Sequence, residues 1–271
     1  MTRTEASTDA MSMIEAKPGQ RAATNVAAVL ELEDGTVYEG VSFGADVPRS
    51  AEIVFNTGMV GYPEMLTDPS YTGEIIVSTY PMVGNYGVPA AGEGPGGVLT
   101  RFESSRIHAA GLVVAHYCDE PSHWNTERTL GQWLRDEGIP AITGIDTRAL
   151  TKRLREKGTM LGVMRFEGRD DVEMTNPFAN DLVSRVTIDE PKLYGAGEKR
   201  IALVDCGSKL NILRSLLARH VEVLRVPADY DLTDETVDGV VISNGPGDPE
   251  MVEGAVPVIR KLIERQTPIF G

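Results

Sequence analysis

The feature that most constrains the fold is the regular alternation of short apolar segments with amphipathic segments after residue 200. Four short segments have the pattern of strands, at 200–207, 221–226, 238–243 and 267–271, and the first of them is a continuous apolar strand. Continuous apolar strands of this kind are typical of a parallel sheet that is covered on both faces. Two intervening segments carry apolar residues at helical spacing, at 211–220 and 256–265. The pattern therefore predicts an α/β domain built on a parallel sheet.

The earlier part of the chain has a different rhythm. Residues 27–40 have the pattern of a strand, an Asp34-Gly35 turn and a second strand, which predicts a hairpin. One helix is expected to be capped by Asn125 or Thr126, and another by Asp146, with Gly158 ending it. Further strands are expected at 52–57, 74–80 and 110–115, and 141–145 is short and apolar. This part therefore predicts a mixed β/α domain.

Turn-forming residues mark the boundaries between these parts. Residues 1–25 are expected to be a disordered tail, and 26–167 a first domain. Residues 168–199 are rich in turn-forming pairs and poor in apolar residues, which predicts a linker before a second domain at 200–271. The Gly- and Pro-rich stretch 87–97 is expected to be a flexible excursion from the first domain.

Composition excludes several classes of function. The sequence holds 26 Lys and Arg against 40 Asp and Glu, a formal net charge of −14, so nucleic acid is not an expected partner. The two cysteines, Cys118 and Cys206, cannot build a disulfide framework, which favours a reducing compartment. No segment has the length of a signal peptide core or a membrane span. We expect a cytoplasmic protein with no membrane partner.

A loop at 243–249, Ser-Asn-Gly-Pro-Gly-Asp-Pro, directly follows an expected strand. Gly245 and Gly247 allow the main chain to approach a ligand closely, and their N–H groups could stabilise a developing oxyanion. The alternative is a tight strand exit without chemistry. A phosphate-binding loop is a weaker interpretation, because no Lys followed by Ser or Thr comes after the glycines.

Four segments carry a resemblance to a known family. They are Phe55–Tyr71, Gly144–Thr151, Asp205–Ile212 and Ser243–Pro249. The last resembles the oxyanion strand of class I glutamine amidotransferases. The other three narrow the resemblance to the small, glutamine-hydrolysing chain of carbamoyl-phosphate synthase. The resemblance implies a small-chain N-terminal domain followed by a flavodoxin-like amidotransferase domain.

The resemblance also implies a function. A cysteine thiolate attacks the side-chain amide of L-glutamine with the help of a His/Glu pair. The ammonia then passes to a large chain, where ATP and Mg are expected, which makes carbamoyl phosphate for arginine and pyrimidine synthesis. Ser70, Gly245 and Gly247 match positions that hold glutamine, and Gly245 matches an oxyanion donor. No cofactor or metal is expected on this chain.

The family's nucleophile follows a Pro-Ile-Phe-Gly segment, which here is Pro268–Gly271. We therefore expect a truncated chain, without its catalytic cysteine and His/Glu pair, that is inactive alone. Cys206 is a poor substitute, since His220 lies at the far end of the next helix and the second domain has no other histidine. We expect Cys206 to be a buried packing residue.

Two other groups of residues resemble sites. His116, Cys118, Asp119 and His123 do not have the paired spacing of zinc ligands and are expected to form an ordinary loop. Asp68 and Glu64 could suggest acid–base chemistry, but Asp68 before Pro69 is more simply a turn former. A different class of function stays open, a non-catalytic module that binds glutamine or the large chain.

Overall fold

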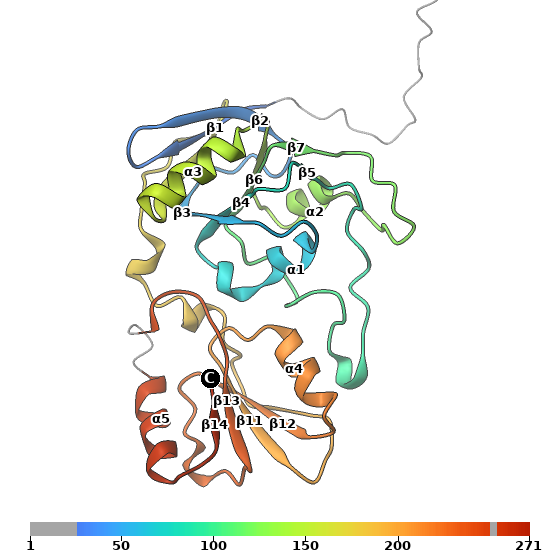
Figure 1. Ribbon diagram of the computed structural model, residues 1–271, viewed down its shortest axis with the longest axis vertical. Helices are drawn as coiled ribbons and strands as arrows, with labels where there is room; N and C mark the ends of the chain where they lie inside the picture. Colours follow the sequence, from blue (N-terminus) through green and yellow to red (C-terminus); the bar gives the residue numbers. More distant parts are fainter. Residues whose placement is uncertain (1–25, 250–253) are drawn as a thin grey trace, which may run out of the picture.

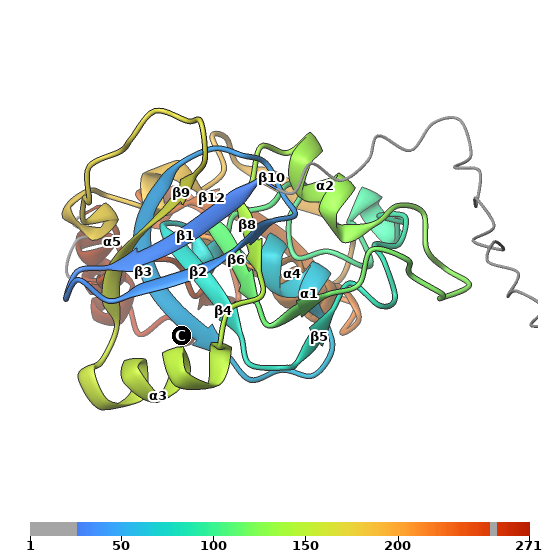
Figure 2. The ribbon, with the colours of Figure 1, turned by 90° about the horizontal axis from the view of Figure 1, so that it is seen from above.

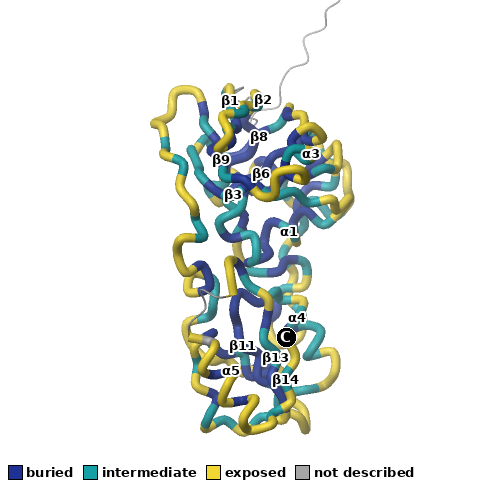
Figure 3. Tube along the Cα trace, turned by 60° about the vertical axis from the view of Figure 1, so that its left-hand side comes forward, coloured by how far each residue is buried: buried dark blue, intermediate teal, exposed yellow. Residues whose placement is uncertain are grey.

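The computed structural model describes residues 26–249 and 254–271, and it consists of two parts stacked along the long axis (Figure 1). The expected tail at 1–25 lies outside the described residues. The upper part is a closed barrel, and the lower part is a five-stranded sheet with helices on both faces. Buried residues concentrate along the strands of both parts (Figure 3). The mixed α/β class expected from the sequence is therefore observed.

The barrel closes seven strands in the order β1-β2-β8-β6-β4-β3-β9. The neighbouring strands β3, β4, β6 and β8 run parallel, and the other pairs are antiparallel. The strand bounds are β1 Ala27–Leu32, β2 Val37–Ser42, β3 Arg49–Asn56, β4 Glu74–Ser78, β6 Gly111–Val114, β8 Ala141–Thr143 and β9 Met160–Phe166. Closure was not expected from the sequence. It leaves no strand of this sheet at an edge.

Two apolar clusters explain why the barrel strands are apolar on both faces. On β4, Ile75 and Val77 join a cluster with Leu150 and Leu154 of α3 (Thr147–Lys157). Ile76 points the other way, into a cluster with residues of α1 (Tyr62–Thr67) and α2 (Leu130–Asp136). Seen from above, α3 lies on one side of the barrel and α2 on the other (Figure 2). Helices therefore cover both faces of the parallel strands.

The predicted hairpin and one of the two predicted helix caps of the first domain are confirmed. The hairpin forms, with β1 antiparallel to β2 and Gly35 at a φ of 80°. Asp146 caps α3, accepting a hydrogen bond of 2.9 Å from the N–H of Ala149. The cap of α2 was predicted wrongly: Thr129, not Asn125 or Thr126, accepts from the N–H of Gln132 at 3.1 Å.

The second sheet has the order β10-β12-β11-β13-β14, and all pairs except β10–β12 are parallel. Its elements are β10 Lys192–Tyr194, β11 Arg200–Asp205, α4 Leu210–Leu217, β12 Glu222–Pro227, β13 Gly239–Ile242, α5 Ala255–Glu264 and β14 Ile269–Phe270. Leu213 of α4 packs on one face, and Val258 and Leu262 of α5 pack on the other. The strand β10 lies within the stretch expected as a linker.

The stretch 87–97 is not a simple surface excursion. Val88 is fully buried and pairs with Arg128 in an isolated bridge. Val98, just beyond the stretch, packs with Leu203 and Leu213 of the second domain. The expectation was wrong because the few apolar residues in and beside this Gly-rich segment find partners only in the tertiary structure.

The remaining elements are short. A two-stranded sheet pairs β5 (Met82–Val83) with β7 (His116–Tyr117). Five 3₁₀ turns complete the described fold: η1 Pro69–Tyr71, η2 Pro95–Gly97, η3 Pro177–Ala179, η4 Val183–Arg185 and η5 Leu232–Asp234. Among the described residues, none of the helices combines the length and apolar character needed to cross a bilayer.

Candidate functional site

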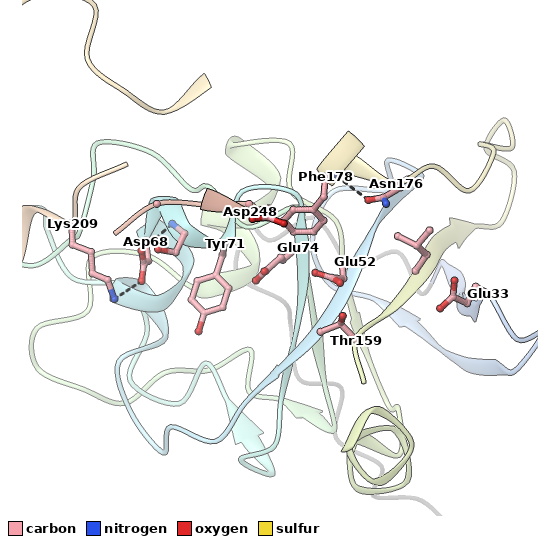
Figure 4. Close-up of a pocket in the computed structure, with 14 residues that line it drawn as sticks. Glu33, Glu52, Asp68, Tyr71, Glu74, Thr159, Asn176, Phe178, Lys209 and Asp248 are labelled. Atoms are coloured by element: carbon pink, nitrogen blue, oxygen red, sulfur yellow. Dashed lines mark hydrogen bonds and ion pairs between the residues drawn. The ribbon is translucent and has the colours of Figure 1, made fainter. Parts of the chain in front are cut away.

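A cleft of about 890 Å³ lies between the two domains and brings the predicted site residues together. Ser70 reaches it from η1 of the first domain, and Gly245 and Gly247 reach it from the loop after β13. The other residues lining the cleft are Glu33, Glu52, Asp68, Tyr71, Glu74, Thr159, Leu161, Asn176, Phe178, Lys209 and Asp248 (Figure 4). Residues far apart in the sequence therefore share one cavity.

Ser70 is oriented by the turn that contains it. The carboxylate of Asp68 accepts a 3.0 Å hydrogen bond from the N–H of Ser70, which confirms Asp68 as a turn former. From the other domain, Asn244 Nδ2 donates to Ser70 Oγ at 2.6 Å. Because that bond uses the oxygen as an acceptor, the hydroxyl proton of Ser70 can still point toward a ligand.

Lys209 is a site residue that sequence reasoning missed. Its Nζ lies 2.7 Å from Asp68 Oδ2, and the two side chains point toward each other in the cleft (Figure 4). Burial lowers the pKa of Lys209, but the hydrogen bond and charge of Asp68 outweigh burial and raise it above the ordinary value. The cleft therefore holds one ammonium group. Its position just beyond the end of β11, where ligands bind in such sheets, could have identified it.

The two glycines of the loop differ in what they require. A Cβ at Gly245 would lie 1.9 Å from the carbonyl oxygen of Cys206, so the loop packs directly on the end of β11. Gly247 has a φ of 82°, which favours glycine, although a Cβ there would meet only ordinary contacts. Within the described residues, no hydrogen bond uses either N–H as a donor.

One wall of the cleft is acidic, which the sequence did not reveal. Glu52 of β3 and Glu74 of β4 are register partners in the parallel pair and lie side by side (Figure 4). Burial raises the pKa of Glu74 to about 8, and the carboxylates of Glu52 and Asp68 add to the shift. At neutral pH the Glu74 carboxyl therefore holds its proton and can donate a hydrogen bond.

Cys206 has the environment of a packing residue. Burial, with a contribution from the neighbouring carboxylate of Asp205, raises the pKa of its thiol to about 11. Its N–H donates to Ser243 Oγ at 3.0 Å, which joins the ends of β11 and β13. Among the described residues no histidine forms a hydrogen bond with its sulfur.

The loop with His116, Cys118, Asp119 and His123 does not gather these side chains. Asp119 accepts from the hydroxyl of Tyr117, Cys118 donates to the Glu120 carbonyl, and His123 Nδ1 accepts from the N–H of Asn125. In the described ranges no group of three or more His, Cys, Asp or Glu is arranged to hold a metal ion.

Comparison with known proteins identifies the class to which this architecture belongs. Residues 202–271 match the family model "Glutamine amidotransferase class-I", the class whose oxyanion loop the 243–249 segment resembles. Residues 30–164 match "Carbamoyl-phosphate synthase small chain, CPSase domain". The chain belongs to the carbamoyl-phosphate synthase small-chain family.

Three relatives illustrate the range of proteins to which this chain is similar. The chain is 48% identical over 249 residues to "Multifunctional protein CAD" of Squalus acanthias, covering 90% of this chain and 11% of that protein. It is 43% identical over 252 residues to "Carbamoyl phosphate synthase arginine-specific small chain" of Saccharomyces cerevisiae, covering 89% and 61%. It is 43% identical over 244 residues to "Carbamoyl-phosphate synthase [ammonia], mitochondrial" of Homo sapiens, covering 89% and 16%. The chain thus spans less than two thirds of each relative.

Proposed function

We propose that this chain is the glutamine-binding part of a carbamoyl-phosphate synthase small subunit. In that subunit, glutamine is hydrolysed and the ammonia passes to a large chain that uses ATP, Mg and bicarbonate. The observation that carries the proposal is the meeting of Ser70 with Gly245 and Gly247 in one interdomain cleft, in a chain that matches both family models. One relative is named as an arginine-specific small chain and another as a multifunctional protein. These names favour a role in arginine and pyrimidine synthesis.

The cleft has the polarity that a free amino acid requires. Lys209 supplies a cation for the α-carboxylate, and the acidic wall that includes Glu52 attracts the α-ammonium group. The hydroxyl of Ser70 can donate to the ligand. The N–H of Gly245 would then stabilise the amide oxygen as it gains negative charge.

We infer that Cys206 does not attack the amide. A thiol with a pKa near 11 is almost wholly protonated at neutral pH, and attack requires the thiolate. The nucleophile in this proposal is the cysteine that family resemblance places after the Pro-Ile-Phe-Gly segment.

We further propose that the second domain is of the flavodoxin-like type. The parallel strands β12, β11, β13 and β14 lie in an order in which the first strand is flanked by the second and third. That order matches the start of the flavodoxin-like arrangement, in which ligands bind beyond the carboxyl ends of the strands. The loop after β13 and Lys209 lie at that edge.

A second candidate function is a non-catalytic module that holds the large chain. The human relative is named "Carbamoyl-phosphate synthase [ammonia], mitochondrial". A similar sequence therefore occurs in a protein whose name gives ammonia and not glutamine. The protonated thiol of Cys206 is compatible with this alternative.

Calorimetric titration of the chain with L-glutamine separates the two candidates. We expect saturable binding that weakens roughly tenfold or more in Lys209→Met, since a charge-assisted hydrogen bond contributes about 1.5–3 kcal/mol. Ser70→Ala should weaken it less, by roughly fivefold. The control Lys261→Met removes a surface partner of Asp231 and should leave binding unchanged. A chain that captures the large chain but gives no heat with glutamine would support the non-catalytic module.

A further inference from the structure

A second cavity between the domains, of about 510 Å³, adjoins the cleft that contains Ser70 and Lys209. Neighbouring residues line the two spaces: Pro69 and Ser208 face the second cavity, while Ser70 and Lys209 face the cleft. The second cavity is lined by the first domain, by the segment that connects the domains, and by the second domain. Its volume lies in the range of small-molecule sites.

The two cavities differ in charge. The cleft is lined by five Asp and Glu side chains, of which Glu74 is protonated at neutral pH, and by one ammonium group, Lys209. The second cavity is lined by the cations Arg106, Arg185, Lys192 and Arg225, and by the carboxylates Glu103 and Asp189. A local excess of positive charge is notable in a chain with a formal net charge of −14.

Ion pairing with residues outside the cavity neutralises one of these cations and one of these carboxylates, so the excess stays the same but rests on groups without an ion-pair partner. Arg225 is paired with the buried Asp205 at 2.7 Å, and Glu103 is paired with Arg214 at 2.9 Å. Neither therefore contributes much free charge to the cavity. What remains is Arg106, Arg185 and Lys192 against a single Asp189.

The three remaining cations form no ion pair within the described ranges. Arg106 Nη2 donates to the carbonyl oxygen of Arg185 at 3.2 Å, which holds the first domain to the segment that connects the domains. The ammonium of Lys192 lies 5.0 Å from the centre of the Tyr194 ring. Both arginines are exposed.

His108 lies on the same wall and is sensitive to this charge. Its Nδ1 is 3.2 Å from Thr72 Oγ1. Burial lowers the pKa of His108 to about 4, and the positive charge of Arg106 contributes to the shift. The imidazole is therefore neutral at pH 7, and an anion placed beside it would raise its pKa.

We propose that this second cavity binds a small phosphorylated metabolite, whose phosphate lies between the guanidinium groups of Arg106 and Arg185. Guanidinium groups bind phosphate oxygens through paired hydrogen bonds, and two guanidinium charges together favour a multiply charged phosphate over a singly charged anion. Lys192 adds a third charge, and Val98 and Leu210 offer apolar surface for the rest of the molecule. The ligand would contact both domains and the segment between them, so its binding would stabilise their arrangement. This proposal does not depend on glutamine binding.

The test uses the 271-residue chain and pyrophosphate as the probe, at constant ionic strength. The pKa of His108 is followed by NMR, with His108→Asn used to assign its signal. We expect saturable pyrophosphate binding that raises the His108 pKa and the unfolding temperature. The double variant Arg106→Gln/Arg185→Gln should bind at least roughly tenfold more weakly.

Two further variants keep the test decisive. Arg155→Gln removes an exposed arginine of α3 that lines neither interdomain cavity, and it should bind pyrophosphate as the unchanged chain does. If the double variant does not fold, Lys192→Gln alone should still weaken binding. No change in the His108 pKa with pyrophosphate, or equal weakening in Arg155→Gln, would overturn the proposal.

Discussion

At Gly245 both the packing of the loop and the proposed chemistry depend on glycine having no side chain. Its N–H is the proposed oxyanion donor, and its Cα lies against the carbonyl of Cys206 so closely that a Cβ would be 1.9 Å from that oxygen. At Gly245 a structural requirement therefore coincides with the proposed functional one. An activity measurement alone would not separate the two.

We expect Gly245→Ala to lower the free energy of unfolding by about 1–3 kcal/mol, because the loop must move off the end of β11. Gly239→Ala is the matched control in the same sheet, since its Cβ would come no closer than 3.4 Å to any neighbour. Urea unfolding of the two variants provides the measurement. Equal effects in both would contradict the packing argument.

A second expectation at this scale concerns Cys206. Because its thiol is buried and its pKa is raised, we expect no ammonia release from glutamine that depends on Cys206. Alkylation by iodoacetamide at neutral pH should be much slower at Cys206 than at the partly exposed Cys118. Peptide mapping after timed alkylation measures both rates. Glutaminase activity that disappears in Cys206→Ala would contradict this expectation.

At the scale of elements, the parallel register of β3 and β4 sets the electrostatics of the cleft. It places Glu52 beside Glu74 and keeps both on the wall that faces the second domain. A partly buried carboxyl beside another carboxylate is costly to ionise, so the register creates a group that titrates near neutral pH.

This pairing predicts the pH dependence of stability. The pKa of Glu74 is about 8 in the folded chain and near 4.5 in the unfolded one, so only the unfolded chain loses the proton between these values. Stability should therefore fall as pH rises from about 4.5 to 8. Glu74→Gln should remove most of this dependence and stabilise the chain at pH 8 by about 2–4 kcal/mol, since one pKa unit corresponds to about 1.4 kcal/mol.

Urea unfolding of the chain and of Glu74→Gln between pH 5 and pH 8.5 measures this effect. Glu33→Gln serves as the control, because Glu33 lines the same cleft but lies outside the β3–β4 pair. A pH dependence that is unchanged in Glu74→Gln would rule out the proposed titration.

At the scale of the whole molecule, a partly buried polar network joins the two domains. Arg214 of α4 donates to the carbonyls of Leu99 and Phe102 at 2.6 and 2.9 Å. It also pairs with Glu103, whose other carboxylate oxygen accepts from the N–H of Asn211 at 2.8 Å. The segment just beyond 87–97 is thereby held against the second domain.

We expect Arg214→Leu to cost about 3–5 kcal/mol, because it leaves the carboxylate of Glu103 buried without its partner. The loss should fall on the interface, so calorimetry should resolve two unfolding transitions in place of a single cooperative one. Arg219→Leu, which removes only a bond to the Ser215 carbonyl on the surface of the same region, should change neither the midpoint nor the number of transitions. A single transition in Arg214→Leu would show that other contacts couple the domains.

The sequence by itself determined the features that depend on neighbouring residues. The turn at Gly35, the cap at Asp146, the parallel strands after residue 200 and the glycine loop at 243–249 all follow from local dihedral preferences and apolar spacing. Resemblance placed the chain in its family and selected Ser70, which local patterns alone would not have singled out. The roles of Ser70, Gly245 and Gly247 in binding glutamine, and the domain boundaries, stay predictions.

Only the tertiary structure decided the closure of the barrel, the Lys209–Asp68 pair, the Glu52–Glu74 pair and the contacts made by Val88 and Val98. Each of these depends on which distant segments become neighbours. The residues of a strand do not by themselves determine which strand pairs with it. The sequence around a single Val or Lys is the same whether the side chain lies in solvent or against another domain. The charges of the two interdomain cavities follow for the same reason: they sum over side chains that only folding brings together.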